Sequence, residues 1–215
     1  MENRRTRVKI CGITRVADVE AAVSAGADAL GFVFVPASRR SIDIGLAREL
    51  IAAVPAFVQT VALFADAQVD WVETVVDQVG PDLLQFHGNE TGRFCRQFGR
   101  PYIKAVSAEL DDTERDRVLA DHASARGFLL DSHAVSGLGG TGHTFDWGRW
   151  PRQAGRKGRP WILAGGLTPE NIAEAVSTLS PYAVDVSSGV EEAPGIKSAE
   201  LIHAFMRGVG HARNH

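Results

Sequence analysis

Short runs of apolar residues recur along the chain, and most of them are nearly continuous rather than alternating with polar residues. Continuous runs are typical of parallel strands that are covered by helices. The pattern predicts eight strands, at residues 7–11, 29–35, 58–64, 83–87, 102–106, 127–131, 160–165 and 183–188.

The segments between these runs show helical spacing. The stretch ADVEAAVSAG ends on a glycine, GLARELIAAV follows Asp43, and WVETVVDQVG repeats valine along one helical face. In TPENIAEAVSTL, Thr168 occupies the N-cap position and Pro169 the first turn, so a helix is predicted to begin there. The helical pattern is weakest in the polar segment 111–123 and in the short segment 146–155.

Eight strand–helix units in 215 residues predict an α/β protein, a single (β/α)₈ TIM barrel that spans residues 1–215 as one domain. An open doubly wound sheet alternates in the same way and is the rival fold, although eight strands favour the closed barrel. No linker or internal repeat divides the chain, and the basic stretch 152–159 is predicted to be a solvated loop.

The composition argues against several classes of partner. The 23 basic and 26 acidic side chains give a formal net charge of −3, so no global positive field attracts nucleic acid or an anionic membrane. No apolar run reaches the roughly 20 residues of a membrane-spanning helix, and no signal-peptide stretch follows MENRRTR. Two cysteines do not make a disulfide framework. We therefore expect a cytoplasmic protein that binds neither nucleic acid nor membranes.

Residues capable of chemistry gather where the predicted strands end, which is the edge where barrel enzymes hold their active sites. Each has a structural explanation when taken singly: free cysteines pack in cores, as predicted for Cys95 in RFCRQF, and His87 before Gly88 can cap a turn. Taken together they predict one functional edge. In chain order, the strand ends carry Cys11, the loop PASRRS, Asp66, His87, Ser107, Asp131, Gly165–Gly166 and Ser187–Ser188.

Two glycine-containing loops predict a phosphate site. AGGLTPENI joins a strand to a helix through Gly165 and Gly166, and VDVSSGVE places Ser187, Ser188 and Gly189 after the next strand. Glycine allows close approach of the backbone, and free N–H groups at a helix start favour an anion. The glycines can instead serve only tight turns, but their place after strands seven and eight, where barrel enzymes commonly hold phosphate, favours phosphate binding.

Residues 137–142, GLGGTG, match the dinucleotide fingerprint G-x-G-x-x-G. They start well after the preceding strand, no long helix follows them, and no acid stands about 20 residues further on. We interpret them as a mobile active-site loop. His87, His133 and His143 lack metal-ligand spacing. The sequence therefore predicts no metal and no cofactor.

The sequence resembles the phosphoribosylanthranilate isomerase family of tryptophan biosynthesis in six stretches, namely VKICGIT, ADALGFVFVPASRRSI, LLQFHGNE, LLDS…GGTGHTFDW, LAGGLTPENI and AVDVSSGVE…PGIK. These extend from residue 8 to residue 197. The pairing of KICGIT with DVSSGVE is the most specific part. The resemblance implies a compact (β/α)₈ barrel that rearranges N-(5-phosphoribosyl)anthranilate to 1-(2-carboxyphenylamino)-1-deoxyribulose 5-phosphate, an Amadori rearrangement with no redox step.

The resemblance implies a role for three side chains. The family's general base, the cysteine of KICG, falls on Cys11, and its general acid, the aspartate that ends the sixth strand, falls on Asp131. Arg40 corresponds to the arginine that faces the substrate's carboxylate. The acid serves the ring oxygen and the base serves C2 of the sugar. We expect nearby cations to help Cys11 ionise, and apolar walls or a negative charge to keep Asp131 protonated.

The resemblance places the substrate's phosphate on the two glycine-containing loops, at Gly165, Gly166, Ser187, Ser188 and Gly189. His87 and Asp185 are candidates for contact with the substrate or with the residues around it. Ser198 stands where the family often has an acid, and serine also caps a helix. The only partner expected is a small phosphoribosyl substrate, and a monomer is favoured over a homodimer.

Two alternatives stay open. One is another phosphosugar barrel, such as an indole-glycerol-phosphate synthase or a histidine-pathway isomerase, although the latter typically has an aspartate where this chain has Cys11. The other is a barrel that binds a phosphate ligand without catalysis. The presence of both Cys11 and Asp131 argues against it.

Overall fold

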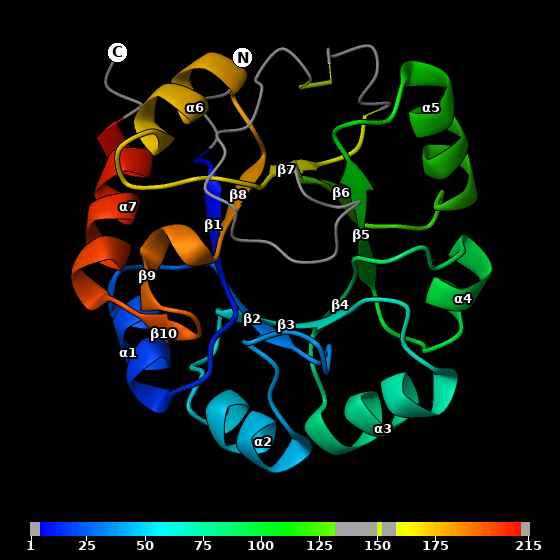
Figure 1. Cartoon of the computed structure of the whole chain (residues 1–215), viewed down its shortest axis with the longest axis horizontal. Coiled ribbons are helices and arrows are strands. Elements are labelled where there is room, and N and C mark those ends of the chain that lie inside the picture. The colour runs from blue at the N-terminus through cyan, green and yellow to red at the C-terminus, as the bar shows by residue number, and fades with distance from the viewer. Residues whose placement is uncertain (1–4, 132–149, 152–157, 212–215) are drawn as a thin grey trace.

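The structure is a computed structural model that describes residues 5–131, 150–151 and 158–211. Eight parallel strands form a closed barrel, in which each strand pairs with the next and β8 returns to pair with β1 (Figure 1). This ring confirms the predicted barrel and excludes the open sheet. The strands are β1 Arg7–Cys11, β2 Ala29–Val33, β3 Gln59–Phe64, β4 Leu83–Phe86, β5 Tyr102–Ser107, β6 Gly127–Asp131, β7 Trp161–Leu163 and β8 Ala183–Val186.

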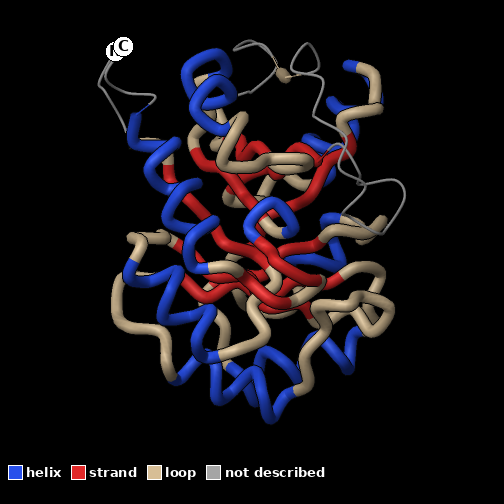
Figure 2. The backbone as a smooth tube through the Cα atoms, turned by 60° about the vertical axis from the view of Figure 1, so that its left-hand side comes forward, coloured by secondary structure: helices blue, strands red, loops and turns tan. Residues whose placement is uncertain are grey.

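Helices cover the outer face of the barrel, as the side view in Figure 2 shows. Those in the described part of the chain are α1 Val16–Ser24, α2 Ile44–Ala52, α3 Val69–Val79, α4 Gly92–Arg96, α5 Asp112–Asp121, α6 Ile172–Leu179 and α7 Ala199–His211. The last helix, α7, packs against both α6 and α1, so the helical layer closes where the barrel closes (Figure 1). None of these described helices has the length and apolarity to span a membrane.

The start of α6 differs from the prediction, because the helix begins at Ile172 rather than at Thr168. The side chain of Asn171 accepts a hydrogen bond from the backbone N–H of Thr168 at 2.9 Å and donates one to the carbonyl of Gly166 at 2.8 Å. These bonds hold the intervening residues in a turn, so Asn171 rather than Thr168 is the N-cap. The same side chain fixes the glycine-containing loop after β7.

The chain after β8 also differs from the prediction. β8 ends at Val186, a 3₁₀ turn follows at Ser188–Val190, and β9 Glu191–Ala193 pairs antiparallel with β10 Ile196–Lys197. This hairpin has too few residues per strand to show a periodic pattern in the sequence. The predicted glycine-rich loop 137–142 and most of the predicted helix at 146–155 lie outside the described residues, as do His133 and His143.

The polar helix α5 is confirmed, and its start is held by a capping box. The carboxylate of Asp111 accepts from the backbone N–H of Glu114 at 2.7 Å, and the carboxylate of Glu114 accepts from that of Asp111 at 3.1 Å. Leu119 is the only residue of α5 that is buried. Local hydrogen bonding therefore compensates for the small apolar face of this helix.

Apolar side chains fill two spaces. The larger space lies between the strands and the helices, and it holds the stacked rings of Phe34, Phe64 and Phe86 as well as the buried thiol of Cys95. The barrel interior holds smaller clusters, which consist of Val61, Leu83 and Ile103, and of Ala105, Leu129 and Ala164. Side chains alternate between the two faces of each strand. The inward-facing positions beyond these clusters, nearer the carboxyl ends of the strands, are therefore free to carry polar groups.

Candidate active site

The carboxyl ends of the strands enclose a cavity of about 510 Å³. Asp66, at the end of β3, also lines it. Ser107 does not, because its hydroxyl accepts the backbone N–H of Glu109 at 3.1 Å and so closes a local turn. The structure brings the predicted site residues together around this one cavity: Cys11, Arg40, His87, Asp131, Gly165, Gly166, Asp185, Ser187, Ser188 and Gly189 all line it.

Cys11 is the last residue of β1, and it is buried with 6% of its surface exposed. Lys9 lies on the same side of β1, and its Nζ is 2.9 and 3.0 Å from the two carboxylate oxygens of Asp185 on β8. Gly31 of β2 pairs in register with Cys11. A Cβ atom at Gly31 would lie 2.7 Å from the thiol sulfur and 2.9 Å from Cε of Lys9. Glycine at this position therefore makes room for the thiol and the lysine side by side.

Two opposing effects act on the thiol of Cys11. Burial raises its pKa, and the negative charge of Asp185 adds to this, while the ammonium group of Lys9, and more weakly that of Lys197, lowers it. The cations predicted to help ionisation are therefore present, but burial outweighs them and the pKa of Cys11 is raised. The pKa of Lys9 is raised as well, since attraction to Asp185 and Cys11 outweighs its burial, so Lys9 keeps its positive charge beside the thiol.

Asp131 ends β6, three strands from β1 around the ring, and its carboxylate contacts an imidazole. Nε2 of His87 lies 3.1 Å from Oδ2 of Asp131, and Nδ1 of His87 lies 3.1 Å from Nε2 of Gln85. An amide nitrogen can only donate, so with Gln85 placed in this way Nδ1 accepts and Nε2 carries the proton that it donates to Asp131. His87 is thus a partner of Asp131 and not only a turn residue.

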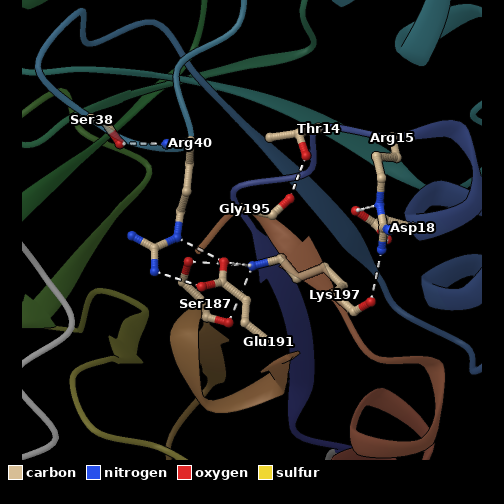
Figure 3. Close-up of polar contacts among 9 residues, drawn as sticks. All are labelled: Thr14, Arg15, Asp18, Ser38, Arg40, Ser187, Glu191, Gly195 and Lys197. Atoms are coloured by element: carbon tan, nitrogen blue, oxygen red, sulfur yellow. Dashed lines mark hydrogen bonds and ion pairs between the residues drawn. The ribbon is translucent and has the colours of Figure 1, made fainter. Parts of the chain in front are cut away.

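Arg40, in the loop after β2, is held by a carboxylate that the sequence pattern did not identify. Its Nε and Nη2 donate to the two oxygens of Glu191 on β9, each at 2.7 Å. Nζ of Lys197 on β10 also donates to Glu191 at 2.7 Å, and to the carbonyl of Ser187 at 3.1 Å. Figure 3 shows Arg40, Glu191 and Lys197 converging from three segments. Only the hairpin geometry brings the three together.

The loops after β7 and β8 form one wall of the cavity. Gly165 and Gly166 have φ of +86° and +64°, a region that disfavours other residues, and within the described part of the chain no acceptor is found for their backbone N–H groups. A Cβ atom at Gly189 would overlap the carbonyl of Leu167, so the two loops pack backbone against backbone. Such a concave wall with free N–H groups suits an anion.

Comparisons with known proteins agree with this geometry. The sequence model of the N-(5'-phosphoribosyl)anthranilate (PRA) isomerase family matches residues 8–208. The N-(5'-phosphoribosyl)anthranilate isomerase of Bordetella parapertussis is 50% identical over 210 residues, which cover 95% of this chain and 96% of the relative. The crystal structure of phosphoribosyl anthranilate isomerase from Thermotoga maritima superposes with a TM-score of 0.82 at 35% identity, covering 95% of this chain and 98% of that one.

A further solved structure shows phosphoribosyl anthranilate isomerase in complex with reduced 1-(o-carboxyphenylamino)-1-deoxyribulose 5-phosphate. It superposes with a TM-score of 0.76 at 35% identity, and covers 95% of this chain and 98% of that one. These matches extend from β1 into α7, and they select this family over the other phosphosugar barrels. The chain therefore belongs to the N-(5'-phosphoribosyl)anthranilate isomerase family and is an isomerase of tryptophan biosynthesis.

Proposed function

We propose that the cavity carries out the Amadori rearrangement of N-(5-phosphoribosyl)anthranilate by general acid–base catalysis, with Asp131 as the acid and Cys11 as the base. The observation that carries this proposal is that a thiol, a carboxylate, a guanidinium group and two glycine-containing loops line a single cavity. A volume of about 510 Å³ suits a ligand of this size. The solved relative that binds the reduced product supports the same substrate class.

The reaction divides into two proton transfers. Asp131 donates a proton to the furanose ring oxygen, the bond between C1 and that oxygen breaks, and the nitrogen lone pair forms a C=N bond at C1. The thiolate of Cys11 then removes the proton from C2, and the electrons of the C–H bond form an enolamine. Tautomerisation of the enolamine gives the 2-ketone of the open-chain product. No electron acceptor is needed, because C1 is reduced as C2 is oxidised.

The neighbours of the two groups suit these roles. The positive charge of Lys9 favours the thiolate of Cys11. His87 donates to the carboxylate that forms when Asp131 releases its proton. Burial raises the pKa of Asp185, and repulsion from Asp131 adds to this effect, so the two carboxyl groups that line the cavity act on each other.

Two anchors hold the ends of the substrate in this proposal. Arg40 binds the anthranilate carboxylate through charge-assisted hydrogen bonds. The phosphate binds the backbone N–H groups of the wall formed by Gly165, Gly166, Ser187, Ser188 and Gly189. With both ends held, the ribose lies between Asp131 and Cys11, and the reacting atoms meet without a bimolecular encounter.

The direct test is an isomerase assay that follows the loss of anthranilate-type fluorescence. We expect the native protein to turn over the substrate, and Asp131→Asn to lower kcat by about two orders of magnitude or more with little change in substrate affinity. Asp77→Asn, which neutralises an exposed aspartate on α3, serves as the control and should be unaffected. An inactive native protein would refute the function, and normal turnover by Asp131→Asn would remove Asp131 from the acid role.

We further propose that the protein acts as a monomer in the cytoplasm. In the described part of the chain, the exposed large hydrophobic side chains are Phe57 and Tyr182, which do not form a broad apolar patch. Solved relatives include monomers derived from the dimeric enzyme of Thermotoga maritima, so both states occur among them. Light scattering should give a mass near 23.1 kDa, and a value twice as large would contradict the proposal.

A further inference from the structure

Glu191 is a buried carboxylate that sits behind the cavity rather than in its wall. Its side chain is 5% exposed, and it lies between the 16% exposed side chain of Arg40 and the fully buried side chain of Lys197. Arg40 lines the cavity, whereas Glu191 and Lys197 do not. Glu191 therefore does not face the cavity itself, but it contacts Arg40, which does (Figure 3).

The two hydrogen bonds from Arg40 to Glu191 decide which edge of the guanidinium group is available. Nε and Nη2 donate to Glu191 at 2.7 Å each, which occupies one side of the planar fork. One N–H of Nη1 and the second N–H of Nη2 form the end edge of the group, and within the described residues no hydrogen bond to this edge is found. A carboxylate can bind that edge with two parallel hydrogen bonds. The pair with Glu191 thus orients Arg40 without consuming its capacity to bind a second carboxylate.

The stem of Arg40 is held as well. A Cβ atom at Gly12 would lie 2.5 Å from Cδ of Arg40, so the arginine side chain packs directly on the backbone that follows Cys11. This contact places the cation beside the thiol, and attraction between Arg40 and Cys11 acts on the pKa of the guanidinium after the effects of Glu191 and burial. Glu191 therefore orients only the guanidinium end of Arg40, because the aliphatic part of that side chain is already held by packing.

The other partner of Glu191 reaches the phosphate loop. Nζ of Lys197 donates to Glu191 at 2.7 Å and to the carbonyl of Ser187 at 3.1 Å. One carboxylate between two cations leaves a net positive charge on this side of the cavity. Burial raises the pKa of Glu191, but Arg40 and Lys197 outweigh it and lower that pKa, so the carboxylate stays ionised at neutral pH.

The hairpin that carries Glu191 is fastened to the loop after β1. The hydroxyl of Thr14 donates to the carbonyl of Gly195. Nη2 of Arg15 donates to the carbonyl of Lys197 at 2.9 Å, and the same guanidinium group pairs with Asp18 at 2.6 Å (Figure 3). These contacts give Glu191 a fixed position relative to the end of β1, which is where the thiol lies.

We propose that Glu191 is a positioning residue for substrate recognition, which aims the free edge of Arg40 at the carboxylate of the substrate and, through Lys197, ties that anchor to the phosphate loop. This inference rests on the proposed function, in which Arg40 binds the anthranilate carboxylate. Loss of Glu191 lets the guanidinium group rotate away from the cavity, so substrate binding weakens while the two proton transfers are unchanged. A variant that lacks the Glu191 carboxylate should therefore have a higher KM, and this change should depend on the presence of Arg40.

The test is a double-mutant cycle with Glu191→Gln, Arg40→Ala and the combined variant, measured by kcat and KM in the isomerase assay. Glu191→Gln keeps the size of the side chain and removes its charge. We expect it to raise KM about tenfold, the scale of a lost charge-assisted contact, and to leave kcat nearly unchanged. The combined variant should have the KM of Arg40→Ala alone, because residues that act through one another are not additive. Glu192→Gln, at the exposed next position of β9, is the matched control and should behave as the native protein.

The outcomes separate the two proposals. An Arg40→Ala variant with native KM refutes the role of Arg40 in the proposed function and, with it, the role of Glu191. If Arg40→Ala raises KM but Glu191→Gln does not, or if their effects multiply in the combined variant, the positioning role is overturned while the proposed function stands. A fall of kcat alone in Glu191→Gln also overturns it. Should Glu191→Gln fail to fold, Glu191→Asp keeps the charge but shortens its reach, and the same cycle with Arg40→Ala applies.

Discussion

Cys11 and Cys95 are both buried thiols, yet their surroundings give them different chemistry. Cys11 lies at the wall of the cavity beside the charged side chain of Lys9. Cys95 lies in α4 among aromatic rings, and burial raises its pKa to about 12. Cations act on both thiols, namely Lys9 on Cys11 and Lys104 on Cys95, but of the two only Cys11 lines the cavity. At the scale of the residue, access to the cavity therefore separates the two thiols.

The first prediction compares the two thiols. Cys11→Ser should abolish turnover with little effect on stability, because a hydroxyl ionises far less readily than a thiol and so supplies almost no anionic base near neutral pH. Cys95→Ser should keep turnover and lower the thermal midpoint, because it places a polar group in the core. Iodoacetamide should inactivate the enzyme by modifying Cys11, faster at higher pH because burial raises the pKa of that thiol. Native turnover by Cys11→Ser would refute the base role.

The second prediction concerns the pH dependence of kcat/KM. Groups that act on Cys11 are Lys9 on the same strand, Asp185 on β8, Lys197 on β10 and Arg40 in the loop after β2. The thiolate is the active form, so activity rises with pH as Cys11 loses its proton. Lys9 lowers the pKa of Cys11, so Lys9→Met should raise it and move this limb toward higher pH.

The control for this prediction is Lys104→Met, which also removes a buried lysine from an ion pair. Nζ of Lys104 lies 3.3 Å from the carboxylate of Glu90, and Lys104 is not among the charges that act on Cys11. Both variants should lose stability, since each leaves a buried carboxylate without its partner. Only Lys9→Met should move the limb of the pH profile. An equal shift in both variants would show that the effect is structural.

The helix α5 shows how an element can form with little help from the core. It buries only Leu119, whereas the shorter helix α6 buries four apolar residues. Its capping box satisfies two backbone N–H groups at the amino end, and Asp112 and Glu114 complement the helix dipole there. The element is therefore held by a few local residues, although its helical pattern in the sequence was among the weakest.

The third prediction follows from this cap. Asp111→Ala should lower the free energy of unfolding by about 1 kcal/mol, the usual cost of losing an N-cap, and leave kcat unchanged. Glu109→Ala removes an exposed acidic side chain just before the same helix, without a capping role, and should change stability much less. Urea denaturation of the three proteins measures the difference. Equal midpoints for Asp111→Ala and the native protein would mean that packing alone holds α5.

At the scale of the whole molecule, closure of the barrel brings the first strand next to the last. β1 pairs with both β2 and β8, so Cys11 near the amino end of the chain and Ser187 near its carboxyl end line the same cavity. The loops after β7 and β8 then pack against each other beside that strand. We therefore expect a ligand that binds these loops to stabilise the ring at its point of closure.

The fourth prediction is that inorganic phosphate raises the thermal midpoint. At a phosphate concentration of about one hundred times Kd, binding adds about 2.7 kcal/mol to the free energy of unfolding. For a chain of this size that corresponds to a rise of roughly 5–10 °C. Chloride at equal ionic strength is the control. If chloride raises the midpoint as much as phosphate does, the loops hold no specific phosphate site.

The sequence alone determined the order of the eight barrel strands and most of the residues that meet at the cavity. Apolar runs and helix caps depend on neighbours in sequence, so eight strands and the helix α5 were predictable. The carboxyl ends of parallel strands in a barrel share one edge, so Cys11, Asp131 and the loops beginning at Gly165 and Ser187 could be grouped without coordinates.

Only the tertiary structure decided which polar groups pair with each other. Glu191 contacts Arg40 across 151 positions in the chain, and Lys9 contacts Asp185 across 176. Asn171 occupies the N-cap position predicted for Thr168, and its side chain bonds back to Thr168 and Gly166 in the loop after β7. Such pairs depend on the register in which β8 pairs with β1 and on the short β9–β10 hairpin. Neither feature produces a periodic pattern in the sequence. The upward shift in the pKa of Cys11 also depends on the tertiary structure, because burial causes it and the thiol is buried only once the ring is closed.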